Sequence, residues 1–405
     1  MKTRPTIGIL GLGHVGLPTA VGFADLGFRV IGADDDNGKA ELIRSGIPPF
    51  YEPDLQEILT SVLSNGMFQV AQSVKEAIVK SDVIFVCVGT PQNDDGSADL
   101  SQIEIVGRII AAESLSDKLV VEKSTTPVAT AQNLQESMRK HGQNSVIIEV
   151  AVNPEFLREG TGLQDFFNPE RIVLGVESER ACTVLVDIYS PLIARMNGCS
   201  DTDVTRDNRR FVITDLNTAE LIKHASNSFL ATKISFINTV ADICEKVGAD
   251  VTQVSRGMGM DPRIGSSFLD AGLGFGGYCL PKDIKAFSKI GEDLGVDMSI
   301  FKAVSSVNQN RSKHVIGKLN EELGRLHGKT AALWGLSFKP DTDDIREAPA
   351  IPLAKRLLSE GMSLRLHDPE SSEYFAQIIT PGERVHYFGS PEEAARGAHV
   401  VIIVT

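Results

Sequence analysis

The chain has 405 residues, of which 42% are hydrophobic and 23% charged, as expected for a soluble globular protein of two or three domains. The formal net charge of −13 argues against non-specific binding to nucleic acid or to an anionic membrane, because both need a basic surface. Five cysteines without a CxxC pair favour reduced thiols in the cytoplasm and no metal site, and no stretch is long and apolar enough to span a bilayer.

The first elements predict a dinucleotide-binding fold. Residues 6–10 form a short apolar strand, a helix is expected over 17–26, and a second strand over 29–32 leads to Asp34. Between the first strand and the helix stands the motif Gly11-Leu12-Gly13-His14-Val15-Gly16. The glycines allow a tight turn and let a pyrophosphate approach the helix N-terminus. An acid about 20 residues further on suits the ribose hydroxyls and repels a 2′-phosphate, which favours NAD over NADP.

Three further strands are predicted in the same domain, over residues 82–88, 118–121 and 144–151. Each ends in a polar loop; the loops are Gly89-Thr90-Pro91, Glu122-Lys123-Ser124-Thr125-Thr126-Pro127 and Asn153-Pro154-Glu155-Phe156-Leu157-Arg158-Glu159-Gly160. Ligands of open α/β sheets bind at the carboxyl ends of the strands, so these loops are expected to line the cofactor cleft. Each loop alone could equally be a simple turn. Cys87 is expected to be a core residue within its strand.

The middle of the chain is predicted to be helical. After a strand over 171–175 and a helix near Cys182, a polar loop is expected over 197–208. Apolar positions at helical spacing then predict one long helix over 216–247, with enough apolar surface to pack against a second subunit. Lys223 and Asn227 are four residues apart on this helix and therefore share a face, which could reach into a site. The alternative is a solvated polar stripe, and periodicity alone favours it.

The segment Gly272-Leu273-Gly274-Phe275-Gly276-Gly277-Tyr278-Cys279-Leu280-Pro281-Lys282-Asp283 is where we place the chemistry. Pro281 indicates a helix start, so Cys279 is expected just outside a helix N-terminus with Lys282 beside it. Both features favour the thiolate, and Asp283 could orient a water or polarise the thiol. The alternative is a buried free cysteine beside a glycine turn. Arg263, in a polar turn upstream, is a candidate for a phosphate or sugar hydroxyl, or a surface arginine.

The last part predicts a second open parallel sheet. A helix is expected over 301–326, and strands over 330–339, 363–366 and 398–404 alternate with helices over 351–359 and 390–396. This set lacks the glycine motif, but Lys339 and Arg346 lie at the carboxyl end of its first strand, which suits a nucleotide. The chain stops in or just after a buried-looking strand, so a tail beyond residue 405 stays open.

The predicted fold class is therefore α/β, with two Rossmann-like, doubly wound parallel-sheet domains joined by a helical domain that has one long central helix. The expected divisions are residues 1–203 for cofactor binding, 204–312 for dimerisation and 313–405 for binding of the nucleotide part of a substrate.

Taken in order, these motifs resemble the UDP-glucose/GDP-mannose dehydrogenase family over nearly the whole chain. The resemblance rests on Gly11 to Gly16, Val88-Gly89-Thr90-Pro91, Glu122-Lys123-Ser124-Thr125, Asn153-Pro154-Glu155-Phe156-Leu157, Lys223 with Asn227, Phe275 to Asp283, and Phe338-Lys339 with Arg346. It implies NAD-dependent oxidation of the C6 alcohol of a nucleotide sugar to a carboxylate with two NAD⁺. The segment 261–264 favours the UDP-glucose branch, with another UDP- or GDP-sugar as the alternative.

The resemblance also implies roles. Cys279 would attack the C6 aldehyde, and a thiohemiacetal and then a thioester would follow. Lys223 would stabilise the developing oxyanion. Asp283 and Thr125 would hold a water, Glu155 would assist as general base, and Asn227 would position the sugar. Arg263 would reach across a homodimer interface to the neighbouring site.

The implied contacts form two sets. Cofactor contacts are expected from Gly11, Gly13, His14, Val15, Gly16, Asp34, Lys39, Gly89, Thr90, Pro91, Ser124, Thr125, Glu159 and Arg346. Substrate contacts are expected from Glu155, Phe156, Leu157, Lys223, Asn227, Arg263, Phe275, Gly276, Cys279, Phe338 and Lys339. Tyr278, Asp270 and a long loop over 197–210 depart from the family pattern and bear on the choice of sugar.

Two other functions fit parts of the sequence. A two-electron 3-hydroxyacid dehydrogenase shares the plan of a Rossmann domain followed by a helix, and it would be indifferent to loss of Cys279. A non-catalytic NAD sensor would bind nucleotide without turnover, but the set of Cys279, Lys223 and Asp283 argues against it.

Overall fold

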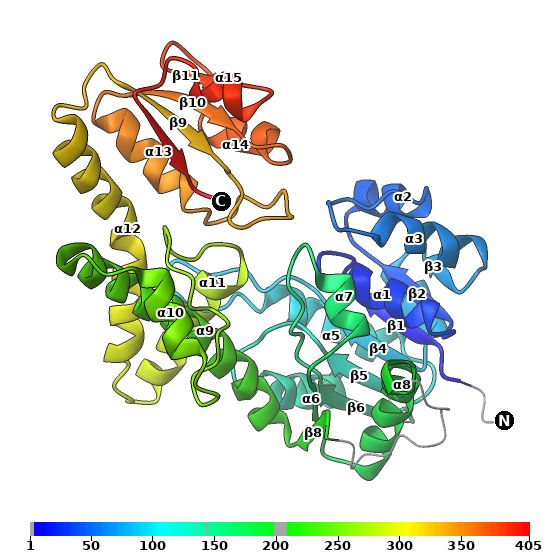
Figure 1. Cartoon of the computed structure of the whole chain (residues 1–405). Coiled ribbons are helices and arrows are strands. Elements are labelled where there is room, and N and C mark those ends of the chain that lie inside the picture. Colours follow the sequence, from blue (N-terminus) through cyan, green and yellow to red (C-terminus); the bar gives the residue numbers. More distant parts are fainter. Residues whose placement is uncertain (1–3, 143–144, 198–208) are drawn as a thin grey trace. The chain divides into compact units, whose positions relative to one another are not determined.

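The computed structural model describes residues 4–142, 145–197 and 209–405 (Figure 1). The chain divides into two compact units, Met1–His224 and Ala225–Thr405, and the long helix α9 (Leu216–Val247) contributes to both. The loop predicted over residues 197–208 lies almost wholly outside the described residues.

The first unit is built on an eight-stranded sheet with the order β3-β2-β1-β4-β5-β6-β7-β8. All neighbours are parallel except β6 and β7, which meet in an antiparallel pair. The strands are β1 (Ile7–Leu10), β2 (Val30–Ala33), β3 (Phe68–Val70), β4 (Val83–Val86), β5 (Lys118–Glu122), β6 (Ile148–Val152), β7 (Ile172–Gly175) and β8 (Phe211–Thr214). Strands buried on both faces explain the continuous apolar runs in the sequence.

A hydrophobic core lies on each face of this sheet. Ile7, Ile9 and Phe85 point into one core and Leu10, Ile84 and Val86 into the other, as the two-residue period of a strand requires. The helices are α1 (Gly16–Asp25), α2 (Asn37–Arg44), α3 (Leu55–Ser64), α4 (Val74–Lys80), α5 (Ser101–Glu113), α6 (Thr130–His141), α7 (Gly162–Phe167) and α8 (Glu179–Asn197). Helices α1, α3, α7 and α8 cover the first core, and α4, α5, α6 and the start of α9 cover the second.

The second unit contains a group of helices and a smaller sheet. The helices are most of α9, α10 (Val251–Gly259), α11 (Cys279–Asp293) and α12 (Ser299–Leu323). The sheet is parallel with the order β11-β10-β9-β12, from β9 (Thr330–Trp334), β10 (Ser363–His367), β11 (Val385–Tyr387) and β12 (Val400–Ile403). It packs with α13 (Ala350–Ser359), α14 (Ser372–Ile378) and α15 (Pro391–Ala395). The α/β prediction with two parallel sheets and one long helix is confirmed.

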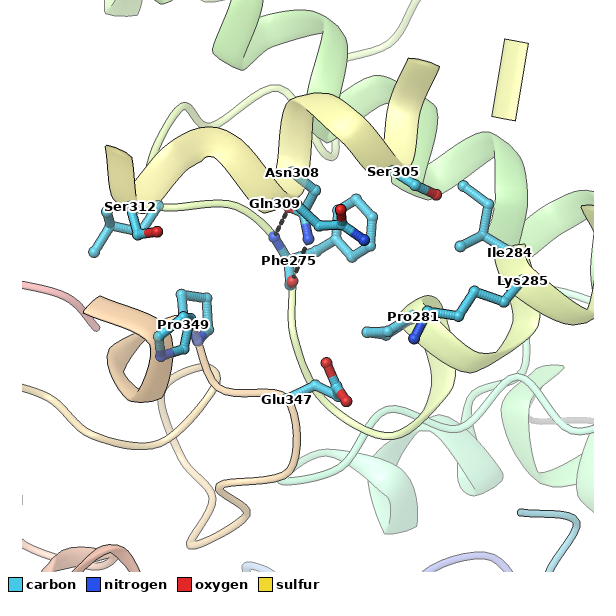
Figure 2. A pocket seen from close by; sticks show the side chains of 12 residues that line it. Phe275, Pro281, Ile284, Lys285, Ser305, Asn308, Gln309, Ser312, Glu347 and Pro349 are labelled. Carbon is cyan, nitrogen blue, oxygen red and sulfur yellow. Dashed lines mark hydrogen bonds between the residues drawn. The ribbon is translucent and has the colours of Figure 1, made fainter. Parts of the chain in front are cut away.

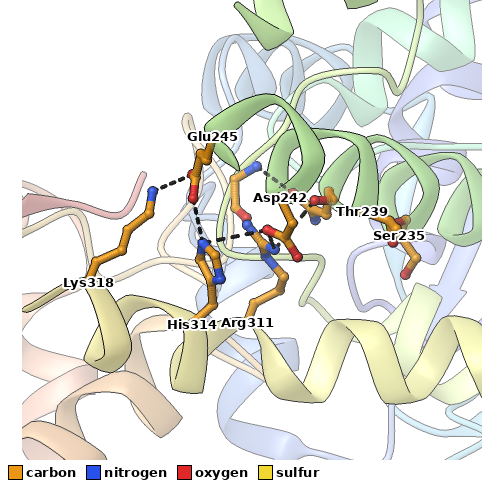
Figure 3. Close-up of polar contacts among 9 residues, drawn as sticks. Ser235, Thr239, Asp242, Glu245, Arg311, His314 and Lys318 are labelled. Carbon is orange, nitrogen blue, oxygen red and sulfur yellow. Dashed lines mark hydrogen bonds and ion pairs between the residues drawn. The ribbon is translucent and has the colours of Figure 1, made fainter. Parts of the chain in front are cut away.

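An ionic network joins α9 to α12 within this unit. Figure 3 shows Asp242 and Glu245 of α9 facing Arg311, His314 and Lys318 of α12. Arg311 Nη1 lies 2.5 Å from Asp242 Oδ1, His314 Nε2 lies 2.9 Å from Glu245 Oε2, and Lys318 pairs with the same glutamate. The donor atoms of Asp242, Glu245 and His314 are within 4.8 Å of one another, a spacing that could hold a metal ion. Because an arginine and a lysine already pair with the two carboxylates, the network serves to fix α12 on α9.

Several element predictions need correction. Strand β4 ends at Val86, so Cys87 lies just beyond its strand and not within it. Strand β6 starts at Ile148, not at residue 144. Cys279 is the first residue of α11, whereas the sequence placed it just before the helix. Strands β3, β8 and β11 were missed because each is only three or four residues long.

Within the described residues we find no helix whose length and apolar character together would suffice to cross a bilayer.

Candidate active site

The glycine turn of the first unit has the shape that the sequence predicted. Gly16 is the first residue of α1, and a Cβ on it would lie 1.8 Å from the carbonyl oxygen of Gly11. Gly11 itself has φ +91°, a value that side-chain-bearing residues rarely adopt. Val15 occupies the N-cap position of α1, and its side chain makes no capping hydrogen bond to the helix N-terminus. This is the arrangement that a pyrophosphate group requires.

Asp34 follows β2 and is held in place from two sides. Its Oδ2 accepts a hydrogen bond of 2.7 Å from the backbone N–H of Leu12, and Lys39 Nζ lies 3.1 Å from its Oδ1. The carboxylate is thereby fixed at the carboxyl end of β2, beside the glycine turn. His14, in the turn, stacks on Phe50 with ring centroids 4.1 Å apart.

The loops after β4 and β5 are tied to each other. Thr90 Oγ1 donates to the Thr125 carbonyl oxygen over 2.9 Å, and Ser124 Oγ donates to the Val88 carbonyl oxygen over 2.7 Å. Gly89 and Pro91 flank Thr90 in the same loop. The structure therefore brings together the cofactor candidates that follow these two strands, at the same edge of the sheet as Gly11 and Asp34.

The loop after β6 supplies a buried ion pair. Lys223 Nζ lies 2.9 Å from Glu155 Oε1, and both side chains are about 5% exposed or less. The Leu157 N–H donates to Glu155 Oε2 over 2.6 Å, and Lys223 Nζ lies 5.3 Å from the centroid of the Phe156 ring. The alternative that Lys223 belongs to a solvated polar stripe is wrong, because the residue is buried. Asn227, one turn further along α9, is buried as well.

Two residues next to this pair were not assigned any role from the sequence. Lys123 is buried and donates to Asn153 Oδ1 over 2.9 Å, and Tyr189 donates to the same oxygen over 2.5 Å. Burial lowers the pKa of Lys123 to about 8. Burial also raises the pKa of the nearby Cys87 thiol to about 12, which disfavours its thiolate. The side chain is only half-buried and packs against the first core, so Cys87 is not the fully buried core residue that the sequence predicted.

Glu52 is a third residue that the sequence did not reveal. It is buried, and its two carboxylate oxygens accept from the N–H groups of Gly160, at 2.8 Å, and Leu163, at 3.2 Å. It thus fixes the end of the loop that carries Glu155 and Glu159. The only signal for it in the sequence is an acid within an otherwise apolar, proline-containing stretch over 47–53.

In the second unit, hydrogen bonds to Asn308 and close contact with Phe338 hold the glycine segment before Cys279 in place. The Phe275 N–H donates to Asn308 Oδ1 over 2.8 Å, and Asn308 Nδ2 donates back to the Phe275 carbonyl oxygen over 2.9 Å, as Figure 2 shows. Gly277 has φ +77°, and a Cβ there would lie 2.7 Å from the Phe338 ring. A side chain at this position would push away the loop that follows β9.

Cys279 begins α11, is half-buried, and is followed by a network of polar side chains. Asp283 is buried; its Oδ1 lies 2.7 Å from Lys282 Nζ, and its Oδ2 accepts from Asn227 Nδ2 over 2.6 Å. The structure therefore brings Asn227 of α9 together with Lys282 and Asp283 in the first turns of α11. It leaves Cys279 half-buried, so the expectation of a buried cysteine beside a glycine turn is wrong as far as burial is concerned.

Tyr278 connects this segment to the loop after β9. Lys282 Nζ lies 5.4 Å and the Arg346 guanidinium carbon 4.5 Å from the centroid of its ring, within the range of cation–π attraction. Asp344 holds the same guanidinium through Nε and Nη2, at 2.9 and 2.7 Å, and the Gly277 N–H donates to the Arg346 carbonyl oxygen over 2.9 Å. Lys339 Nζ lies 5.9 Å from the Phe338 ring.

A cavity of about 230 Å³ lies behind the glycine segment within the second unit (Figure 2). Its lining includes Phe275, Pro281, Lys285, Asn308 and Glu347. Gly276 and Phe338, two of the substrate candidates, do not belong to its lining.

Arg263 stands apart from the groups around Cys279. Its guanidinium pairs with Asp261 at 2.6 Å and is 87% exposed. Nothing in its own unit therefore buries it, which fits either a surface arginine or a residue that acts on another subunit.

Comparison with known proteins gives a consistent result along the chain. Residues 5–193 match the NAD binding domain of the UDP-glucose/GDP-mannose dehydrogenase family, residues 217–310 its central domain and residues 332–405 its UDP binding domain.

Individual relatives cover almost the whole chain. The UDP-glucose 6-dehydrogenase YwqF of Bacillus subtilis is 41% identical over 399 residues, which are 98% of this chain and 87% of the relative. A UDP-glucose 6-dehydrogenase of Rhizobium meliloti is 40% identical over 403 residues, 98% of this chain and 89% of the relative. Among solved structures, a UDP-glucose dehydrogenase of Pyrobaculum islandicum superposes with a TM-score of 0.92 at 40% identity, covering 100% of this chain and 90% of the other.

Proposed function

Because the chain belongs to the UDP-glucose/GDP-mannose dehydrogenase family, and is thus an NAD-dependent oxidoreductase, we propose that it oxidises the C6 alcohol of UDP-glucose to the carboxylate of UDP-glucuronate. The observation that carries the chemistry is Cys279 at the start of α11, half-buried beside the bonded set of Asn227, Lys282 and Asp283. A thiol so placed can retain an aldehyde between two oxidations, which a two-electron dehydrogenase does not need.

The residues of the first unit fit an NAD molecule. Gly11 and Gly16 leave no room for a Cβ at the turn where the pyrophosphate would lie, and the fixed Asp34 carboxylate suits the two hydroxyls of the adenine ribose. When bound, an NAD⁺ molecule accepts one hydride, so the two oxidations together would consume two NAD⁺. We propose that the remaining cofactor contacts come from the loops that carry Thr90, Thr125 and Glu159 and from Arg346.

The chain's own groups would carry out the rest of the reaction. After the first oxidation the Cys279 thiolate adds to the C6 aldehyde and gives a thiohemiacetal. The second oxidation converts this to a thioester, and a water attacks the thioester, releasing the carboxylate and the thiol. Lys223 supplies a positive charge for the oxyanions of these steps. Asp283 and Thr125 hold the water, and Glu155, bonded to Lys223, accepts a proton.

The remaining groups would bind the substrate. Asn227 positions the sugar, and Phe275, Gly276, Phe338 and Lys339 contact the nucleotide sugar together with Phe156 and Leu157. We also propose that the chain is organised as residues 1–203, 204–312 and 313–405, since each of the three family matches lies within one of these ranges.

The stoichiometry of NADH tests this function. With UDP-glucose as substrate, two NADH are expected per molecule consumed, with UDP-glucuronate as product. The measurement is the absorbance of NADH against product counted by chromatography, over a panel of UDP- and GDP-sugars. A two-electron 3-hydroxyacid dehydrogenase would give one NADH per substrate, and an NAD sensor none. Turnover of another sugar in place of UDP-glucose would make the choice of sugar wrong and leave the chemistry intact.

We further propose that α9 forms the core of a homodimer. Phe229, Phe236 and Ile243 are seven residues apart and 64%, 49% and 57% exposed, so they lie along one face of the helix. The opposite face is occupied within the unit, since Ser235 donates to the Val304 carbonyl oxygen and Asn238 accepts from the Gly272 N–H. An apolar stripe of this length on an exposed helix face favours a protein partner. A second copy that covers it would allow the exposed Arg263 to act in the neighbouring site.

Replacing Phe236 with aspartate is expected to shift the protein from dimer to monomer, because a charge would be buried in the apolar stripe. Sedimentation equilibrium measures the dissociation constant, which should rise by at least about tenfold, since more than 1.4 kcal/mol is lost. Ile105→Asp is the matched control, because Ile105 is equally exposed but lies on α5. Dimers of unchanged strength in Phe236→Asp would contradict the assignment of this face.

A further inference from the structure

Two buried glutamates have no place in the proposed chemistry. Glu122 is the last residue of β5 and is 0% exposed, and Glu220 lies in the second turn of α9 and is 3% exposed. Their carboxyl groups lie close enough for each to influence the pKa of the other. Within the described residues neither forms an ion pair, since the neighbouring Lys123 bonds Asn153 and Lys223 pairs with Glu155. Two adjacent carboxylates without a counter-ion would repel strongly in the interior, so the pair must hold a proton.

The hydrogen-bond partners show which carboxyl holds the proton. Both oxygens of Glu220 accept backbone N–H groups, from Ala129 at 2.7 Å and from Ala131 at 2.9 Å. These groups form the N-terminus of α6, where Ala129 has φ +74° and offers no side-chain cap, so Glu220 acts as the cap from another helix. A carboxyl group that accepts on both oxygens is the anion.

Glu122 has the complementary environment. Its Oε1 accepts from the Thr126 hydroxyl, and its buried Oε2 has no hydrogen-bond partner among the described residues. Burial and the adjacent Glu220 raise the pKa of Glu122 well above its ordinary range. Burial also raises the pKa of Glu220, to about 7, although the N–H groups of α6 lower it in part. The proton therefore belongs on Glu122 Oε2.

The pair lies where three elements meet. Glu122 ends β5, Glu220 belongs to α9, and the N–H groups belong to α6. One turn after Glu220, His224 Nε2 lies 2.8 Å from the Thr126 carbonyl oxygen, and Lys223 precedes it. We propose that Glu122 is a neutral acid whose carboxyl O–H donates a hydrogen bond to the Glu220 carboxylate, and that this pair positions the loop over residues 123–128, with Thr125, against the turns of α9 that carry Lys223. Both are positioning residues, not catalytic ones.

The proposal has a definite dependence on pH. The charged or titratable groups around the pair are Lys123 after β5, Lys223 and His224 on α9, and the N-terminus of α6. A carboxyl whose pKa is raised by folding stabilises the fold fully below its unfolded pKa, and this contribution is lost as the pH rises through the folded pKa. Glu122 therefore makes the first unit less stable toward alkaline pH.

Substitution with glutamine separates the two glutamates. Glutamine is neutral and can donate a hydrogen bond, so Glu122→Gln should fold and keep turnover within about twofold. When the pH is raised from 6 to 9, the free energy of unfolding of Glu122→Gln should fall less than that of the wild type. Glu220→Gln turns an amide NH₂ toward a backbone N–H, and its thermal midpoint should fall by about 2–8 °C at pH 6. Glu76→Gln, at a partly exposed position of α4, is the control.

Infrared spectroscopy gives a second readout that does not depend on the proposed function. The wild-type minus Glu122→Gln spectrum at pH 6 should contain the carbonyl band of a protonated carboxyl group, and the wild-type minus Glu76→Gln spectrum should not. The proposal is overturned if Glu122→Gln fails to fold, if it is as unstable as Glu220→Gln, or if the protonated band is missing. Because stability and spectrum carry the test, absence of turnover on any sugar would sink the proposed function and leave this inference standing.

Discussion

Replacing Cys279 with alanine is expected to lower the rate of carboxylate formation by about 10³-fold or more, a loss typical of a deleted nucleophile. Without the sulfur the aldehyde cannot be held as a thiohemiacetal, so the second oxidation has no bound substrate. The fold should survive, because Cys279 is half-buried at the first position of α11 and the bonds of Asp283 to Lys282 and Asn227 do not involve its sulfur. The rate is followed as NADH formed per second with product analysis.

Serine at this position gives a sharper result. A hydroxyl group ionises far less than a thiol, so Cys279→Ser should release NADH from the first oxidation and then stall before or at an acyl-enzyme. Mass spectrometry of the stalled protein would show the added sugar. Cys244→Ala is the matched control, because Cys244 is a buried cysteine of α9 and no chemistry is assigned to it. Two NADH per UDP-glucose at an undiminished rate in Cys279→Ala would exclude the covalent route.

Local patterns predicted much of this fold. The bounds of α9 follow from an apolar period that runs unbroken from Leu216 to Val247, and both helix termini fall where the pattern stops. The glycine turn was predictable because the need for Gly11 and Gly16 arises from atoms only a few residues away. Short strands such as β8 and β11 carry too few residues for a period to be recognised.

The parts of the site that the sequence did not reveal depend on contacts between distant residues. Glu52 meets the N–H groups of Gly160 and Leu163 over more than 100 residues, and Glu220 caps α6 from about 90 residues away. No property of the segment around either glutamate encodes these partners. Similarly, the spacing of Lys223 and Asn227 predicts that they share a face of α9 but not that this face is buried.

Replacing Lys223 with alanine is expected to have two separable effects. The Glu155 carboxylate, whose side chain is 4% exposed, would lose the cation at 2.9 Å, and loss of one partner of a buried pair costs about 3–5 kcal/mol of folding free energy. The turnover number should fall by about 10²–10³-fold, since a fixed positive charge near a developing oxyanion has an effect of this size. Urea unfolding measures the first effect and steady-state kinetics the second.

A double variant distinguishes stability from catalysis at this pair. Lys223→Ala with Glu155→Ala removes the unpaired carboxylate, so it should recover much of the lost stability while turnover stays low. Lys223→Arg keeps the charge but spreads it over a planar group of different shape, so turnover should recover only in part. Lys246→Ala, at an exposed position of the same helix, controls for loss of a lysine from α9. If the double variant regained both stability and turnover, Lys223 would serve only to neutralise Glu155, and the oxyanion role would have to be assigned to another cation such as Lys282.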